Sequence, residues 1–145
     1  IGVSAASNGR QGATSGMLEG GVKGIDGLGW RVHGTLKRAG DHQAANYVLT
    51  NTGIEESNFS AAAGYNKDRF GLQAYYSQFE NELGILRSAH IGNLTDLKAS
   101  IGSPRPRIVE PFSYDIENPK QVVSHRLIFH VQIRKDVLNC LSFVF

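Results

Sequence analysis

The sequence predicts an all-β fold, an antiparallel meander of hairpins with one short helix in a long loop. Three observations predict it. The chain holds 17 glycines and only 19% charged residues, where soluble domains average roughly 25%. Apolar and polar residues alternate with a period of two, the spacing of a strand with two unlike faces. An Asp-Gly pair at residues 26–27 is a strong hairpin signal.

The first hairpin joins residues 13–24, a glycine-rich strand, to residues 30–37 through a turn at 25–28. Along the second strand, one face takes Trp30, Val32, Gly34 and Leu36, and the other takes Arg31, His33, Thr35 and Lys37. Polar and cationic side chains in a row cannot lie in a dry core without partners. We therefore expect this second face to meet water or a polar lumen.

A second hairpin is predicted between residues 57–65 and 70–83, with a turn at 66–69. Its apolar faces match, and they are formed by Phe59, Ala61, Ala63 and Tyr65 on the first strand and by Phe70, Leu72, Ala74 and Tyr76 on the second. A further extended stretch starts near Gln121 and includes Val122, Val123, Leu127 and Ile128.

The remaining residues are predicted to be loops, at 1–12, 39–56 and 84–120. Within the last loop, residues 92–101 have helical spacing, with Leu94, Leu97 and Ile101 on one side. Asn93 or Thr95 is the expected N-cap, and the prolines at 104 and 106 end the helix.

Short turns thus alternate with long loops, as in outer-membrane barrels. The apolar runs are shorter than the ~20 residues of a membrane helix, but a spanning strand needs only ~9–11 residues. We therefore expect the meander to be a fragment of a transmembrane β-barrel, although a β-sandwich can show the same alternation. The aromatic residues near strand ends fit an interfacial girdle or the general preference of strands for aromatics, and they are Trp30, Tyr65, Phe70, Tyr76 and Phe79.

The candidate chemical motifs all fit structural roles better than catalysis. Residues 8–12 lack the context of a phosphate loop. The spacing of His90, Asp96 and His125 fits no standard zinc site. Cys140 is the single cysteine, and the net charge of +2 is scattered along the chain. We expect no enzyme, metal or cofactor, and no nucleic-acid partner.

Several segments resemble TonB-dependent outer-membrane receptors of the type common in Bacteroidetes. They include NGRQG at 8–12, GTLKRAGD at 34–41, Asn46-Tyr47, NTG at 51–53, LGILRSAHIGNLTDL at 83–97, FSYDI at 112–116, PKQ at 119–121 and Ser124-His125. The run at 83–97 is the most specific. The resemblance covers residues 1–128 and implies early barrel strands with their extracellular loops.

This family imports bulky, scarce ligands such as ferric siderophores, cobalamin or glycans through a large plugged barrel in the outer membrane. TonB grips a segment before the plug, so its contact lies in regions outside this chain. The resemblance implies outer-membrane lipid and a small-molecule or glycan ligand as partners. The expected ligand contacts are Arg31, His33 and Lys37 on the polar strand face and Asn46, Tyr47 and His90 in loops. The three strand residues could equally hydrate the wall or pair with plug carboxylates.

Residues 129–145 depart from the family pattern. A truncation, an altered reading frame or divergence would each explain this departure. We expect these residues to form a C-terminal tail that is only weakly strand-like. Two other functions stay open. A small complete outer-membrane barrel would need eight strands, and about six are predicted. A soluble glycan-binding β-sandwich is the other. Because a partial barrel has open edges, we expect the isolated chain to form a small curled sheet or to aggregate.

Overall fold

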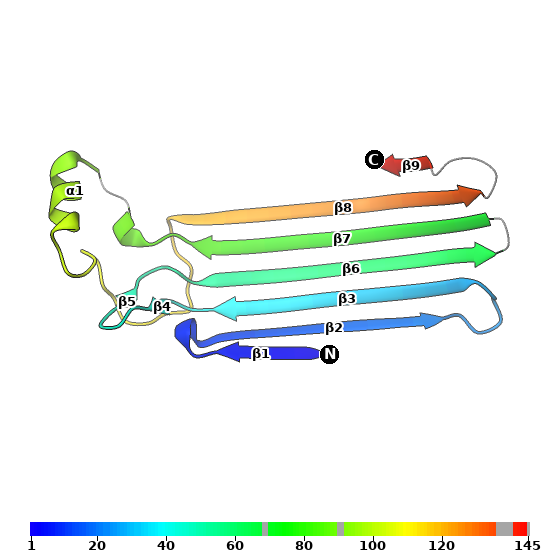
Figure 1. The fold of residues 1–145 in the computed structure, drawn as a ribbon, viewed down its shortest axis with the longest axis horizontal. Coiled ribbons are helices and arrows are strands. Elements are labelled where there is room, and N and C mark those ends of the chain that lie inside the picture. The colour runs from blue at the N-terminus through cyan, green and yellow to red at the C-terminus, as the bar shows by residue number, and fades with distance from the viewer. Residues whose placement is uncertain (68–69, 90–91, 136–140, 145) are drawn as a thin grey trace.

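A computed structural model of the chain describes residues 1–67, 70–89, 92–135 and 141–144. One antiparallel sheet of seven strands dominates it, in the order β1-β2-β3-β6-β7-β8-β9 (Figure 1). A second sheet contains only β4 and β5. The prediction of an all-β fold built as an antiparallel meander is therefore confirmed.

The strands of the large sheet are long at its centre and short at its edges. They are β1 (Gly2–Ala6), β2 (Gln11–Gly21), β3 (Leu28–Ala39), β6 (Ile54–Lys67), β7 (Phe70–Gly84), β8 (Lys120–Lys135) and β9 (Leu141–Val144). The connections contain the remaining elements, which are η1 (Asn8–Arg10), β4 (His42–Gln43), β5 (Val48–Leu49), η2 (Arg87–Ala89) and α1 (Leu94–Ile101).

Both predicted hairpins are present, and β3, β6 and β7 are longer than the alternation alone indicated. Strand β2 instead ends at Gly21, so the prediction of a strand is wrong for residues 22–24. In the β6–β7 hairpin, Ala61 lies opposite Tyr76 and Tyr65 lies opposite Leu72, so the apolar faces match as predicted. Strand β6 begins at Ile54 rather than at residue 57, because Ile54 pairs with β3 on one side and with β7 on the other. Pairing on both sides extends the strand into residues that show no alternation.

The first turn differs from its prediction. The connection between β2 and β3 spans residues 22–27, and Leu28 already belongs to β3. Gly24 and Gly27 adopt positive φ angles of 88° and 86°, a region that glycine enters without steric cost. The carbonyl of Gly27 accepts a 2.8 Å hydrogen bond from the backbone N–H of Asn66. The Asp-Gly pair therefore closes a six-residue loop and links it to the neighbouring strand β6.

Residues 1–12 were predicted to be a loop, and that prediction is wrong for Gly2–Ala6. These residues form β1, which pairs with residues 11–15 of β2 at the edge of the sheet. The small side chains of Gly2–Ala6 show no alternation of apolar and polar residues. An edge strand that is exposed on both faces buries neither face, so its sequence does not have to alternate. The hairpin β4–β5 inside the loop at 39–56 was missed for a similar reason, since each of its strands has two residues.

The predicted helix is confirmed as α1. Asn93 is its N-cap, since its side-chain oxygen accepts a 2.8 Å hydrogen bond from the N–H of Asp96. Thr95 lies inside the helix and is not the cap. Strand β8 runs from Lys120 through Lys135, with a register shift opposite β7 between Tyr75 and Ser77. The expected boundary after residue 128 thus falls inside a continuous strand.

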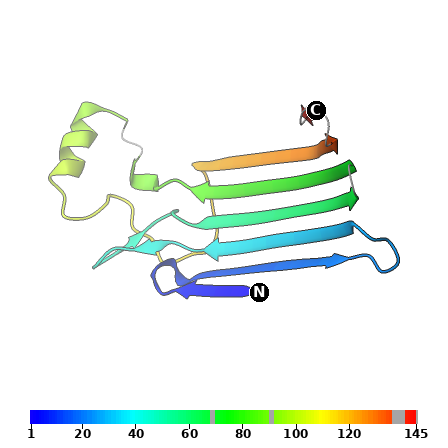
Figure 2. The same ribbon diagram turned by 45° about the vertical axis from the view of Figure 1, so that its right-hand side comes forward.

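The large sheet is a single layer, and its long connections gather at one end. Figures 1 and 2 both place α1, β4 and β5 beyond the same ends of the strands, where the short connection between β1 and β2 also lies, while the connection between β2 and β3 lies at the other end. Among the described residues, no element packs on either face of this sheet. Within that part of the chain, no helix is long and apolar enough to cross a membrane.

Burial is concentrated at the loop end of the sheet and not between layers. Among the residues whose side-chain burial is described (up to residue 127, with gaps at 68–69 and 90–91), Ala39 is the one fully buried hydrophobic residue, and it ends β3. Three polar residues are buried beside it, namely Asp41, Thr50 and Asn51. The described part of the fold therefore has a polar, hydrogen-bonded centre where its loops meet.

Candidate functional site

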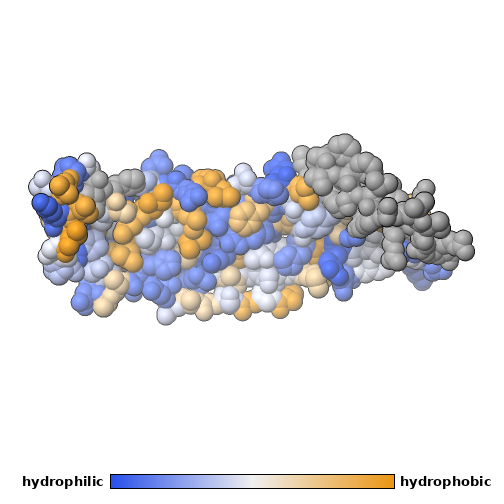
Figure 3. All heavy atoms as spheres, turned by 45° about the horizontal axis from the view of Figure 1, so that its top comes forward, coloured by the Kyte–Doolittle hydropathy of each residue, from blue (hydrophilic) through white to orange (hydrophobic). Residues whose placement is uncertain are grey.

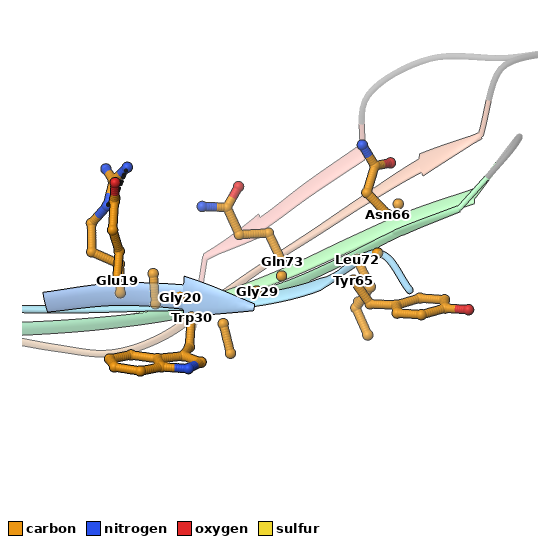
Figure 4. A pocket seen from close by; sticks show the side chains of 14 residues that line it. Glu19, Gly20, Gly29, Trp30, Tyr65, Asn66, Leu72 and Gln73 are labelled. Atoms are coloured by element: carbon orange, nitrogen blue, oxygen red, sulfur yellow. Dashed lines mark hydrogen bonds and ion pairs between the residues drawn. The ribbon is translucent and has the colours of Figure 1, made fainter. Parts of the chain in front are cut away.

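Across β2, β3, β6 and the first half of β7 the large sheet has one apolar face and one polar face, because the registers place like residues opposite one another. Toward the loop end the apolar face becomes polar, with Gln78 and Glu80 of β7 opposite Arg126 and Ser124 of β8. Figure 4 shows this alternation, with Glu19, Asn66 and Gln73 on one side and Trp30, Tyr65 and Leu72 on the other. The apolar face carries Leu18, Leu28, Trp30, Val32, Leu36, Phe59, Ala61, Ala63, Tyr65, Leu72, Ala74 and Tyr76, and toward the loop end it also carries Thr14, Arg38, Glu55, Ser57, Gln78, Glu80 and Glu82. The polar face carries Glu19, Arg31, His33, Thr35, Lys37, Glu56, Asn58, Ser60, Asn66, Gln73, Tyr75, Ser77, Phe79 and Asn81, together with the apolar residues Met17, Ile54, Ala62 and Leu83.

Large side chains of the apolar face are exposed to an extent that is unusual for a packed sheet. Leu18 is 65% exposed and Leu36 is 60% exposed, and Trp30 and Phe59 are exposed as well. Along β3 the face extends from Leu28 to Leu36, which is about 27 Å at roughly 3.4 Å per residue. An exposed apolar surface of this size marks a contact with another protein or with lipid.

The aromatic residues do not form a single girdle. Trp30, Tyr65 and Phe70 lie near the short-turn end of their strands, whereas Tyr76 lies at the middle of β7. Phe79 lies on the opposite face, across from Asn58. Tyr76 instead packs against Phe59, with ring centroids 6.2 Å apart. In Figure 3, apolar spheres lie among hydrophilic ones along the sheet and also at the α1 end.

The three strand residues predicted as ligand contacts lie in one line on the polar face. Arg31 lies opposite Glu19 of β2, and its Nε donates a 2.8 Å hydrogen bond to Glu19 Oε2. His33 lies between Met17 and Ser60, and Lys37 lies between Ala13 and Glu56. The Arg31 and Glu19 side chains stay more than half exposed, so the pair can still contact a molecule above the sheet.

An open hollow of about 860 Å³ adjoins Arg31 toward the short-turn end of the sheet. Glycines form much of its lining, and they are Gly20, Gly27, Gly29, Gly64 and Gly71. In Figure 4 the side chains of Glu19, Asn66 and Gln73 project above this part of the sheet. Gly29, Gly64 and Gly71 lie on the polar face, whereas Gly20 lies on the apolar face opposite Trp30. Because glycine lacks a side chain, another molecule can approach the backbone at these three polar-face positions more closely than elsewhere on that face.

The predicted loop contacts are not brought to this face. Asn46 and Tyr47 lie between β4 and β5 at the loop end, where the N–H of Ala44 donates a 2.9 Å hydrogen bond to the carbonyl of Tyr47. His90 lies outside the described residues. The structure thus places Arg31, His33 and Lys37 together and Asn46 and Tyr47 apart from them.

A buried polar network fixes the loop end of the sheet. The carboxylate of Asp41 accepts hydrogen bonds from the N–H groups of Thr52 (2.9 Å) and Ser113 (3.2 Å). Asn51 donates from Nδ2 to the carbonyls of Ile85, Glu117 and Pro119 at 2.8–2.9 Å. These contacts hold residues 110–119, here called the strap, across the ends of the strands.

The described side chains offer no metal centre. No group of three or more His, Cys, Asp or Glu residues in this part of the chain is placed to hold an ion. His125 lies on β8 opposite Phe79, whereas Asp96 lies on α1, where it forms a 3.4 Å ion pair with Arg107.

Sequence reasoning missed the partner of Arg31 and the loop-end network. Glu19 could have been found, since opposite charges directly across a predicted hairpin are a recognised stabilising pair. The network had no such signal, because Asp41 and Ser113 are 72 residues apart in the chain. Comparisons with protein-family models, curated proteins and solved structures give no match to this chain. The resemblance to TonB-dependent receptors therefore stays a prediction from the sequence.

Proposed function

We propose that this chain forms part of the wall and outer loops of a TonB-dependent outer-membrane receptor, which imports a bulky, scarce ligand of the siderophore, cobalamin or glycan class. The observation that supports this function best is a single-layered antiparallel sheet in which β2, β3, β6 and the first half of β7 carry an exposed apolar face and, opposite it, a polar face. In a bilayer the apolar face meets lipid and the polar face lines the lumen.

The dimensions and the connections support the same proposal. The apolar face extends about 27 Å along β3, and the apolar band of outer-membrane barrels is roughly 25 Å tall. The two long loops (residues 40–53 and 85–119) lie at one end of the strands, together with the short β1–β2 connection, and the β2–β3 connection (residues 22–27) lies at the other. Long loops at one end are also found on the extracellular side of such barrels. In this arrangement the buried network at the loop end fixes the extracellular loops.

Two other functions fit these observations less well. A glycan-binding β-sandwich needs a second sheet over the apolar face, and the only other sheet among the described residues is the two-stranded β4–β5 at the loop end. A small complete barrel needs its first and last strands to pair, whereas β1 and β9 lie at opposite edges of the described sheet.

On the polar face, Arg31, His33 and Lys37 are the ligand contacts within this proposal. Cationic side chains along a lumen wall attract anionic ligands, and ferric siderophores belong to this class. Asn46 and Tyr47, between β4 and β5, belong to the extracellular side in this proposal, where a ligand first arrives. His90 stays a ligand contact predicted from the sequence, outside the described residues. The polar face is therefore proposed as a stretch of the import path.

The test compares adjacent residues that point to opposite faces at the same depth. The complete gene product is prepared without native cysteines (Cys140→Ser in this chain), and Leu18→Cys and Met17→Cys are labelled separately with bimane. After reconstitution into vesicles that contain brominated phospholipids, we expect strong quenching at position 18 and weak quenching at position 17, since bromine on acyl chains quenches only a lipid-facing dye.

Leu36→Cys and Thr35→Cys provide a second pair toward the loop end. Equal quenching at both members of each pair would show that the apolar face does not meet lipid, and the proposal would fail. A water-soluble product that needs no detergent, with both members of each pair labelled by an impermeant maleimide, would favour the β-sandwich.

A further inference from the structure

A cluster of two arginines and two aromatic rings lies at the loop end of the sheet, and the proposed function does not use it. The guanidinium of Arg10 lies over the Phe112 ring, 4.2 Å from its centroid. Phe112 meets Tyr114 edge to face at 5.1 Å, and the guanidinium of Arg38 lies 5.6 Å from the Tyr114 centroid. We call these four residues the arginine–aromatic cluster.

The cluster is assembled by the fold and not by a ligand. Tyr114 donates from its hydroxyl to the backbone carbonyl of Arg10 at 3.1 Å. Between the two rings, Ser113 is held to Asp41 through both its N–H and its carbonyl. Asp41 is only 2% exposed. The rings therefore stand on a buried frame, and a partner could bind them without ordering a loop first.

The arginines keep free hydrogen-bonding capacity. A guanidinium that lies on an aromatic ring uses its face, so its N–H donors stay available at its edge for the two oxygens of a phosphate. Arg10 has no ion pair among the described residues. The one carboxylate near Arg38 is that of Glu55, at 3.9 Å, and both of these side chains are about 60% exposed. Such an exposed pair is weak and exchanges readily for a phosphate.

The position of the cluster on the sheet favours a partner at the membrane surface. Arg38 shares the apolar face, since it lies two residues beyond Leu36 on β3 and opposite Gly12 on β2. In the proposed orientation this point lies just outside the apolar band on the extracellular side, at the level of lipid headgroups. Aromatic and cationic side chains are the groups that settle at this level of a membrane.

We propose that the arginine–aromatic cluster binds the phosphorylated headgroup of an anionic lipid in the outer leaflet. This inference rests on the proposed function, because it needs the apolar face to contact lipid. The two guanidinium groups would contact phosphate oxygens, while the rings of Phe112 and Tyr114 would lie against the sugar or glycerol part of the headgroup.

The experiment titrates the detergent-solubilised complete gene product with lipid A and with its dephosphorylated form. The variant Arg10→Gln/Arg38→Gln removes two charges from the cluster, and Lys23→Gln/Arg105→Gln removes two exposed charges elsewhere as its matched control. We expect the first variant to bind lipid A at least roughly tenfold more weakly, since a charge-assisted hydrogen bond is worth about a tenfold change. The control and the dephosphorylated lipid should show no such loss.

The possible outcomes distinguish headgroup binding from an effect of net charge and from binding of free phosphate. An equal loss of lipid A affinity in Arg10→Gln/Arg38→Gln and in the control variant would mean that only net charge matters, and it would overturn the proposal. Saturation of the site by inorganic phosphate at the same concentration as lipid A would also overturn it. Arg10→Lys/Arg38→Lys keeps the charges without the planar fork and should recover only part of the affinity, so full recovery would contradict a role for stacked guanidinium groups. Heat-modifiable gel mobility confirms that each variant is folded.

The failure of this inference differs from the failure of the proposed function. If bimane at positions 17 and 18 is quenched unequally while Arg10→Gln/Arg38→Gln binds lipid A normally, the membrane role stands and the headgroup site is refuted. If bimane is quenched equally at both positions, the proposed function itself fails.

Discussion

The side-chain amide of Asn51 and the backbone of Glu117 form a reciprocal pair of hydrogen bonds. Asn51 Nδ2 donates to the Glu117 carbonyl at 2.9 Å, and the Glu117 N–H donates to Asn51 Oδ1 at 2.8 Å. The amide thus satisfies both backbone groups of a residue in the strap, as a neighbouring strand would. Asn51 is 4% exposed and has a φ of 64°, a conformation that asparagine tolerates better than most residues.

Asn51→Asp tests this contact without changing the backbone, because aspartate also tolerates positive φ. A carboxylate cannot donate, so it would remove the side-chain donor from the carbonyls of Ile85 and Glu117 and repel them, while the Pro119 carbonyl would keep only its bond from the Ile85 N–H. We expect a loss of about 2–4 kcal/mol in the free energy of unfolding, measured by urea titration. Asn66→Asp, at an exposed position near the end of β6, should change it by less than about 0.5 kcal/mol. Equal effects would mean that the amide is not a structural contact.

Asp41 holds the same strap from the other side of the loop end. Asp41→Ala leaves the N–H groups of Thr52 and Ser113 without their acceptor in a buried place. We expect a loss of about 2–4 kcal/mol and faster hydrogen exchange at both amides. Ser113→Ala is the control, because it keeps the backbone N–H and removes only the exposed hydroxyl contact with Asp115. Unchanged exchange in Asp41→Ala would show that the strap is fixed by other contacts.

The two faces of the sheet could be predicted from the sequence because strand geometry fixes the period of two. Trp30, Arg31 and Val32 alternate whatever lies around them, and the registers of β3 and β6 follow. The predicted line of Arg31, His33 and Lys37 exists for this reason. The function of these residues is a separate question, which the alternation does not answer.

The contacts between distant segments could not be predicted in this way. Tyr114 and Arg10 are separated by 104 residues, and neither has a pattern that points to the other. The edge strand β1 was also invisible, since Gly2–Ala6 is small, exposed and without a period. Loop chemistry at the end of the sheet depends on which backbone groups lack partners, and this is known only once the strands are in register.

Gly84 tests how closely the loop end is packed. A Cβ at this position would lie 2.5 Å from the carbonyl oxygen of Asn51 and 2.9 Å from its carbonyl carbon. Both are backbone atoms that cannot rotate away, so Gly84→Ala should lower the free energy of unfolding by roughly 2 kcal/mol or more. At Gly16 a Cβ would meet nothing within 4 Å, and Gly16→Ala should be neutral or slightly stabilising. The urea midpoints of the two variants give the comparison, and a tolerated Gly84→Ala would mean that the loop end can shift.

Leu18 and Met17 distinguish a membrane wall from a soluble sheet, because they are adjacent, at least half exposed and on opposite faces. In the reconstituted complete gene product, Leu18→Arg puts a charge on the lipid-facing side, and a cost of about 2–4 kcal/mol is expected near the bilayer midplane. Met17→Arg puts the same charge on the polar face and should cost little.

Unfolding by denaturant from vesicles measures this difference between Leu18→Arg and Met17→Arg. In a sheet that is soluble on both faces, neither substitution removes buried surface, so both variants should match the parent protein. A selective loss for Leu18→Arg therefore requires a hydrocarbon environment on one face alone. Equal stability of the two variants would leave the alternation of the sheet intact but remove its connection to a membrane.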